Sequence, residues 1–311
     1  MPPTTLAAAP FDRFRSPVVA PHRWQLAHFR SGTNEPTEIE ATFNVGLDVG
    51  VAVQELREGA LRTLEGWGKL SHRHVFVDSG AFSEGKFVGG QYQVSQPIGH
   101  EEWLRRLELY DRIAQAFGPR AWLVAPDRIG SQTKTFERQR LYRAEVLSIL
   151  ERSGAQLIVP LQRGPWTMLA CARKSFELYG RYRNIVWGIP LRKGATNMRD
   201  LGAFCAELAR DRTLPWRFHL LGLAPPFSKG YLLKHPVKSN PSPLYLDVRQ
   251  TIATWLGDDA PITSDSLRLG ALVGGDRPIT RYQRAGLSRG EAIRRAYEEE
   301  MAAILDWERS G

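Results

Sequence analysis

The sequence predicts a (β/α)8 TIM barrel, and three observations lead to this prediction. Five short runs are almost continuously apolar, which is typical of strands buried on both faces of a parallel sheet. Amphipathic segments lie between these runs, so that a strand followed by a helix repeats at least four times. No GxGxxG motif follows an early strand, which disfavours the doubly wound Rossmann sheet that a chain of 311 residues could also form.

The predicted strands differ in the strength of their apolar pattern. Two upstream segments and one downstream segment are weaker candidates than the central five. In chain order, the clear strands are 74–80, 121–127, 156–162, 185–191 and 218–223, and the weaker ones are 24–29, 39–46 and 261–266.

The predicted helices carry apolar side chains at spacings of three and four residues. In segment 99–118, Trp103, Leu107 and Tyr110 fall on one face, which is the pattern of a helix packed on a sheet. A second predicted helix ends at Gly154, a residue that commonly caps helix C-termini. In chain order, all the predicted helices are 99–118, 133–154, 165–180, 197–211 and 246–257, and the second of these is the one that ends at Gly154.

Composition and charge narrow the class of protein. A net charge of +9 and a pI near 9.7 indicate a polyanionic partner. The two cysteines, Cys171 and Cys205, lie in helical segments without CxxC spacing, so we expect two small core residues and no disulfide. There is no signal peptide and no apolar run of about 18 residues, so we expect a cytoplasmic protein with no membrane contact.

The chain is predicted to form one catalytic domain. Residues 1–23 are rich in proline and alanine and are expected to form a flexible N-terminal arm. Residues 24–311 form the single barrel domain, and a basic loop within 224–260 is inserted before the last strands.

Polar residues lie at the ends of the predicted strands. Because reacting groups of a TIM barrel gather at the C-terminal ends of its strands, the residues read off those ends are expected to converge at one mouth. They are Asp78, Asp127, Gln162, Gly188, Gly222 and Asp265. Each has a structural alternative: Asp127 as a turn residue, Asp265 as a helix cap and Gln162 as a partner of a loop carbonyl. Asp78 is the hardest to explain structurally, because it ends an apolar strand just before a glycine.

The remaining residue types exclude several chemistries. The histidines show no HxH or HExxH spacing, and no strand ends on a lysine that could form a Schiff base. We therefore expect no metal and no cofactor, and keep His219 as a minor candidate that points into or beside the barrel. Paired carboxylates without a metal suit cleavage at an anomeric carbon, where one attacks C1′ and the other moves a proton.

The strand ends, taken in order, resemble the tRNA-guanine transglycosylase superfamily. VDSGAFS resembles the family's TDSGGFQ signature, and VPLQRG resembles its VQGG segment. WGIPLRKG and FHLLGLAPP resemble its glycine-rich strand and its YLMGVGTP stretch. These four matches keep their order between about residue 74 and residue 270, and they imply a (β/α)8 barrel.

The sequence also departs from the tRNA enzymes. Their zinc site of three cysteines and a histidine follows the nucleophilic aspartate, whereas no cysteine or histidine follows Asp265 here. Ala81 replaces a family glycine. We therefore expect no zinc subdomain, and the compact chain looks most like the DpdA branch, which inserts 7-deazaguanines into DNA.

The resemblance implies roles for the strand-end residues. Asp265 would be the nucleophile that forms a covalent glycosyl ester, and Asp78 would be the general acid and base. The base would be bound by Asp127 on its N1–H and N2–H₂ edge and by Gln162 and the backbone near Gly188 on O6. Ser79 would complete the base pocket, and Phe82 would stack on the purine, unless it is a core residue.

The expected partners are DNA, a free 7-deazaguanine base such as 7-cyano-7-deazaguanine, and a helicase or ATPase that opens the duplex. The alternative nucleic acid is tRNA. A non-catalytic barrel that binds nucleic acid or free base, and a metal-free glycoside hydrolase, are further alternatives. Residues expected to contact phosphates, unless they form a solvated loop, are Arg192, Lys193, Lys229, Lys234 and Lys238.

Overall fold

The computed structural model describes residues 28–44, 46–88, 91–191, 195–211, 213–222, 243–265, 278–296 and 298–299. The N-terminal arm 1–23 and most of the basic loop predicted before the last strands lie outside these residues. The five expected phosphate contacts Arg192, Lys193, Lys229, Lys234 and Lys238 lie outside them as well.

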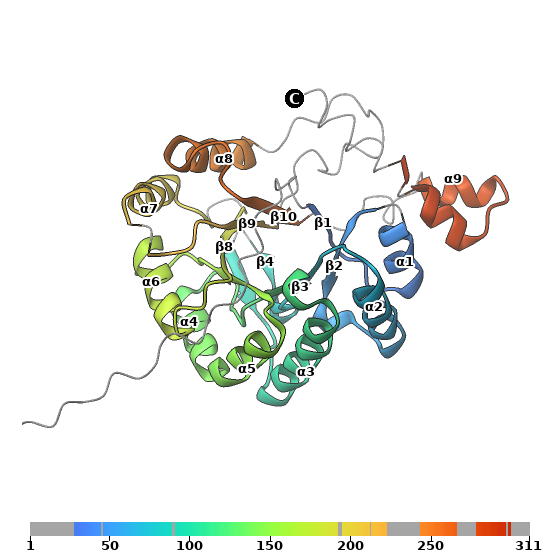
Figure 1. Cartoon of the computed structure of the whole chain (residues 1–311), viewed down its shortest axis with the longest axis horizontal. Coiled ribbons are helices and arrows are strands. Elements are labelled where there is room, and N and C mark those ends of the chain that lie inside the picture. Colours follow the sequence, from blue (N-terminus) through green and yellow to red (C-terminus); the bar gives the residue numbers. More distant parts are fainter. Residues whose placement is uncertain are drawn as a thin grey trace, which may run out of the picture.

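Eight parallel strands close into a barrel, which confirms the predicted fold class (Figure 1). Around the barrel the order is β1, β10, β9, β8, β7, β6, β3 and β2, so the first and last of these strands in the sequence lie side by side. Their bounds are β1 (His28–Arg30), β2 (Asp48–Ala52), β3 (Val75–Asp78), β6 (Ala121–Val124), β7 (Gln156–Pro160), β8 (Ile185–Pro190), β9 (Phe218–Leu221) and β10 (Ile262–Asp265).

Helices surround the barrel, as Figure 1 shows, and a small hairpin is inserted after β3. The hairpin strands are β4 (Gly85–Val88) and β5 (Gln91–Val94), reached through a short 3-10 turn, η3 (Ala81–Glu84). The helices are α1 (Pro36–Asn44), α2 (Glu58–Leu70), α3 (His100–Phe117), α4 (Gln132–Leu141), α5 (Arg143–Ser153), α6 (Met168–Leu178), α7 (Met198–Arg210), α8 (Pro243–Leu256) and α9 (Pro278–Arg284).

One predicted strand is wrong. Segment 39–46 falls mainly in helix α1, which begins at Pro36, a residue suited to the first turn because it needs no backbone N–H there. The strand in this part of the barrel is β2, whose sequence DVGVA lacks a continuous apolar run because it begins with Asp48 and contains Gly50. A Cβ on Gly50 would lie 2.9 Å from the Cα of Ser31, so close strand packing requires glycine there.

The predicted helix 133–154 is two helices. The chain breaks between α4 and α5 at Tyr142, a buried residue whose ring stacks on that of His100 at 5.6 Å. Gly154 ends α5 with a φ of 70°, as its position in the sequence predicted. Both cysteines are buried thiols, in agreement with the predicted core role.

Side chains of the strands alternate between two apolar layers. Phe76, Trp122, Ile158 and Val186 point into the barrel, while their strand neighbours pack against the helices. Gly188 follows the same alternation and faces inward. A Cβ there would meet the Leu221 side chain at 2.8 Å, so the barrel interior has no room for a larger residue.

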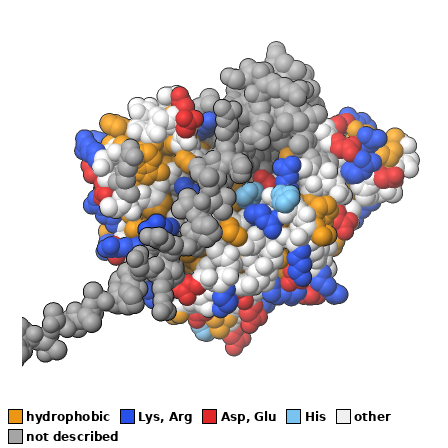
Figure 2. All heavy atoms as spheres, viewed as in Figure 1, with side chains coloured by type: hydrophobic (Ala, Val, Ile, Leu, Met, Phe, Trp, Pro, Cys, Tyr) orange, Lys and Arg blue, Asp and Glu red, His pale blue; other side chains and the backbone are white. Residues whose placement is uncertain are grey.

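The described surface carries charges of both signs. Figure 2 shows Lys and Arg side chains interspersed with Asp and Glu side chains around the edge of one face. No described helix is both long enough and apolar enough to cross a membrane.

Candidate active site

Three aspartates lie at the C-terminal ends of barrel strands. Asp78 ends β3, Asp265 ends β10, and Asp127 lies in the loop after β6. In the barrel order β6 is the neighbour of β3, whereas β1 and β2 separate β10 from β3. The barrel therefore sets Asp78 beside Asp127 at one part of the mouth and Asp265 at another, as the strand-end pattern predicted.

Asp127 is held by two side chains that the sequence also singled out. The Ser79 hydroxyl donates to Oδ1 of Asp127 at 2.7 Å, and Nε2 of Gln162 donates to Oδ2 at 3.1 Å. Oε1 of Gln162 accepts from the Gly130 backbone N–H at 3.2 Å, which fixes the orientation of the amide. Each carboxylate oxygen of Asp127 keeps further lone-pair capacity for a ligand with two adjacent N–H groups.

The surroundings of Asp127 raise the pKa of its carboxyl group. Burial raises the pKa of Asp127 to about 6, although the bond from Ser79, the charge of Arg138 and the bond from Gln162 oppose this rise. The carboxylate is consequently ionised near neutral pH and becomes protonated in mildly acidic solution.

Asp78 has the more strongly shifted carboxyl group. Burial raises its pKa to about 7, with added repulsion from Asp127 and Asp265, while the backbone N–H groups of Gly80 and Ser79 oppose the rise. At neutral pH the side chain therefore populates both protonation states, which is the property a general acid and base requires.

Gly80 lets the chain turn immediately after Asp78. Its φ of 72° lies in the left-handed region, and its N–H donates to Oδ2 of Asp78 at 3.2 Å. A Cβ on Gly80 would lie 2.1 Å from Oε1 of Gln54, a side chain that lines a polar hollow beside the ends of β1 and β2. This close packing leaves the Asp78 carboxyl at the strand end, facing the mouth.

Asp265 is held on both of its oxygens. Oδ1 accepts from the Gly222 backbone N–H at 3.0 Å and lies 3.4 Å from Nε2 of His219. Oδ2 accepts from the Ser31 hydroxyl at 3.3 Å, and the side chain as a whole is 8% exposed. Gly222 is one of the predicted strand-end residues, whereas the sequence pattern did not reveal Ser31, because Ser31 follows β1 at the other end of the chain.

The positions of Ser79, Gly188 and Phe82 bear on the roles that the sequence predicted for them. The single hydroxyl proton of Ser79 is used on Asp127, so Ser79 orients that carboxylate. Gly188 lies two residues before the end of β8, so the expectation that it marks a strand tip is wrong; its position follows from interior packing. Phe82 is 38% exposed and its ring lies 5.9 Å from that of Tyr92, which excludes the core alternative.

A buried ion network supports the loops that carry these residues. Glu84 is fully buried and accepts from both terminal nitrogens of Arg138, with Nη2 at 2.7 Å. Arg138 also donates to the backbone carbonyl of Asp127, and Arg106 donates to that of Ser79 at 2.9 Å. No local sequence pattern indicates this network, because its partners belong to segments far apart in the chain.

We expect Glu84→Gln to lower the free energy of unfolding by roughly 3–5 kcal/mol, because it leaves the charges of Arg138 and Arg128 without their buried carboxylate. Urea unfolding monitored by circular dichroism measures this change. Glu137→Gln is the matched control, since its exposed pair with Lys134 contributes well under 1 kcal/mol. Equal stability of the two variants would contradict a structural role for Glu84.

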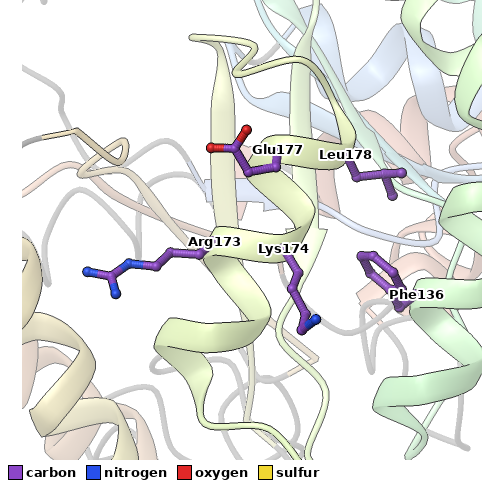
Figure 3. Close-up of a pocket in the computed structure, with 5 residues that line it drawn as sticks. All are labelled: Phe136, Arg173, Lys174, Glu177 and Leu178. Carbon is purple, nitrogen blue, oxygen red and sulfur yellow. The ribbon is translucent and has the colours of Figure 1, made fainter.

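The described residues contain no group of three or more His, Cys, Asp or Glu side chains placed to hold a metal ion. A shallow hollow of a different kind lies on the outer wall, between α4 and α6. Figure 3 shows Phe136 and Leu178 lining it close together, while Arg173 extends away from them. It lies in the helical layer and does not include the strand-end carboxylates.

Comparisons with known proteins leave the reaction open. No family model matches the sequence, and no curated protein matches it. Among solved structures, it is similar to 3-keto-D-glucoside 4-epimerase YcjR from E. coli (11% identity, TM-score 0.46, covering 92% of this chain and all of that one). It is also similar to D-psicose 3-epimerase (11% identity, TM-score 0.44, covering 87% and 96%). Likenesses this weak carry no information about substrate or reaction.

Proposed function

We propose that this chain is an enzyme, a guanine transglycosylase that exchanges guanine in DNA for a 7-deazaguanine base. The observation that supports the proposal is a set of three carboxyl groups at one barrel mouth, each in different surroundings. Asp127 accepts hydrogen bonds from Ser79 and Gln162. Asp78 has a pKa of about 7, and Asp265, at the end of β10, accepts from backbone and side-chain donors.

Asp265 acts as the nucleophile in this proposal. One of its oxygens attacks C1′ of the target deoxyribose, the bond from C1′ to N9 of guanine breaks, and the bonding electrons pass to N9. Asp78 in its protonated form supplies the proton to the leaving base. The incoming base then loses its N9 proton to Asp78 and attacks C1′, which releases Asp265.

Asp127 recognises the base edge. The guanine N1–H and N2–H₂ groups are adjacent donors, and an ionised carboxylate is the side chain that accepts from both at once. Because Ser79 and Gln162 already fix the plane of Asp127, this edge is read by a group that needs no reorganisation on binding. Phe82, exposed at the mouth, offers a ring on which the flipped base can stack.

We expect the exchange rate to be highest between about pH 6 and pH 7. The pKa of Asp127, about 6, sets the acid limit, because the protonated group no longer accepts from both guanine donors. The pKa of Asp78, about 7, sets the alkaline limit, because the ionised group has no proton for the leaving base. Initial rates from pH 5 to 9 measure this profile.

Arg138→Met is the accompanying variant, since the Arg138 charge holds the pKa of Asp127 down. Its acid limit should move to higher pH while the alkaline limit stays in place. A rate that is constant across the range would contradict the assigned roles.

The function is tested by incubating the purified protein with radiolabelled guanine and either duplex DNA, single-stranded DNA or tRNA. The expected result is label in the DNA, followed by its release when unlabelled 7-cyano-7-deazaguanine is added. Mass spectrometry of the digested nucleosides identifies the inserted base. Label in tRNA alone would assign the alternative tRNA substrate, and binding without exchange would assign a non-catalytic barrel.

A further inference from the structure

His219 is a polar side chain in the most apolar part of the barrel. It lies on β9 and is 0% exposed. Its ring is stacked on Phe76, with centroids 4.9 Å apart, and lies 5.8 Å from Phe29. An imidazole in such surroundings is costly unless its nitrogens have partners, so the groups at Nδ1 and Nε2 indicate what the residue does.

Thr263 accounts for one nitrogen. Nδ1 of His219 lies 2.8 Å from the Thr263 hydroxyl oxygen, and this hydroxyl lies 3.2 Å from the backbone carbonyl of Phe218. A hydroxyl can donate one hydrogen bond and accept others. Thr263 can therefore donate to Nδ1 of the neutral ring, or accept from Nδ1–H while donating to Phe218. In the first case Nε2 carries the hydrogen. In the second case Nε2 carries a hydrogen if the ring is charged and is bare if the ring is neutral, and a bare Nε2 would set its lone pair against the nearby oxygen of Asp265.

Asp265 faces the other nitrogen. Nε2 lies 3.4 Å from Oδ1 of Asp265, the same oxygen that accepts from the Gly222 N–H at 3.0 Å. The two atoms are not aligned as a hydrogen bond, and Nε2 bonds no other group among the described residues, so Asp265 is the partner within reach of this buried nitrogen. Oδ1 is thus approached by a backbone donor and an imidazole that are both fixed by the barrel. Oδ2 is approached by the Ser31 hydroxyl at 3.3 Å, a group that can rotate about its own bond.

We propose that His219 is a positioning residue for the nucleophile, with Nε2–H directed at Oδ1 of Asp265 so that Oδ2 is the attacking oxygen. This inference rests on the proposed function for its catalytic consequence. During attack the Oδ2–C1′ bond forms while the C1′–N9 bond breaks, and the electron pair and a proton from Asp78 go to the base. Oδ1 becomes the carbonyl oxygen of the ester and keeps its two donors.

The inference is tested with two variants that differ in the donor. His219→Leu removes the donor and keeps an apolar side chain, whereas His219→Gln places an amide N–H near the position of Nε2. In single-turnover exchange with an oligonucleotide, we expect the Leu variant to form the covalent intermediate roughly 10- to 100-fold more slowly with little change in KM. The Gln variant should recover most of that rate.

His72→Leu is the matched control, because His72 is exposed just before β3, at the end of the barrel opposite the C-terminal strand ends. Thermal unfolding of each variant shows whether it is folded. A folded Leu variant with an unchanged rate, or a Gln variant as slow as the Leu variant, would overturn the positioning role.

A second measurement does not depend on catalysis. Long-range proton–nitrogen NMR of histidine-labelled protein reports which ring nitrogen carries the hydrogen, and the His219→Gln spectrum identifies the signal. We expect a protonated Nε2 in the unaltered protein whose shift moves in Asp265→Asn. A bare Nε2 would overturn the inference. If the unaltered protein exchanges no base, the proposed function fails, and this spectrum alone decides whether His219 and Asp265 are paired.

Discussion

Asp265→Asn is expected to reduce base exchange by roughly 10³-fold or more while the barrel stays folded, because an amide is a far poorer nucleophile than a carboxylate. The fold should survive because Asn keeps an oxygen that can accept from the Gly222 N–H. The change removes the proposed nucleophile, so it should act on the chemical step and leave oligonucleotide binding within a few-fold.

Two readouts separate this role from a general effect. The unaltered protein, quenched in denaturant during turnover, should carry the oligonucleotide as a covalent adduct that migrates slowly on a denaturing gel, and Asp265→Asn should show none. Asp259→Asn is the matched control, since Asp259 is an exposed aspartate in the turn before β10. Exchange above a tenth of the normal rate in Asp265→Asn would show that another group attacks C1′.

Asp78→Asn is expected to have two opposite effects, a loss of exchange by roughly 10²- to 10⁴-fold and a gain in stability at neutral and alkaline pH. The loss follows because Asn cannot deliver a proton to the leaving base. The gain follows from the pKa of Asp78, which rises from 3.8 to about 7 on folding. The folded protein therefore binds this proton more tightly than the unfolded chain does, and its stability falls as the pH rises from about 4 to about 7.

The stability difference between Asp78→Asn and the unaltered protein should depend on pH accordingly. It should be small at and below about pH 4, where the folded carboxyl group is protonated and the unfolded one has begun to take up its proton. Above pH 7 it should reach on the order of 2–4 kcal/mol, because the variant avoids the buried negative charge. Urea unfolding at pH 5 and pH 8 measures the difference. If the variant were less stable than the parent at pH 8, burial beside Asp127 and Asp265 would not be the cause of the raised pKa of Asp78.

The sequence predicted the parts of the fold that are governed by local pattern. Residues 121–124 and 157–160 are apolar and buried at every position, so their pattern is unambiguous. The strand predicted for segment 39–46 was wrong because Ile39, Ala41 and Phe43 alternate as they would in a strand. The same three residues are buried in the short helix α1.

The site was predictable where a barrel rule converts chain position into spatial position. The C-terminal ends of all the barrel strands meet at one mouth, so residues at these ends can be grouped from the sequence. They are Asp78, Asp127, Gln162 and Asp265, each at or just after the end of a strand. Contacts between loops follow no such rule. The pairing of Glu84 with Arg138, or of Ser31 with Asp265, depends on side-chain packing across the fold, which no local pattern encodes.

The closure of the barrel by β1 and β10 joins segments that the ribosome makes first and last among the strands of the barrel. Asp78 and Asp127 belong to the first half of the chain, whereas Asp265 belongs to one of its last strands and is completed by Ser31 from one of its first. On the ribosome, Asp78 and Asp127 emerge early and Asp265 emerges late. If these residues have the roles proposed above, the nascent chain cannot attack a nucleic acid until β10 has docked against β1, so activity would arise only with the closed barrel.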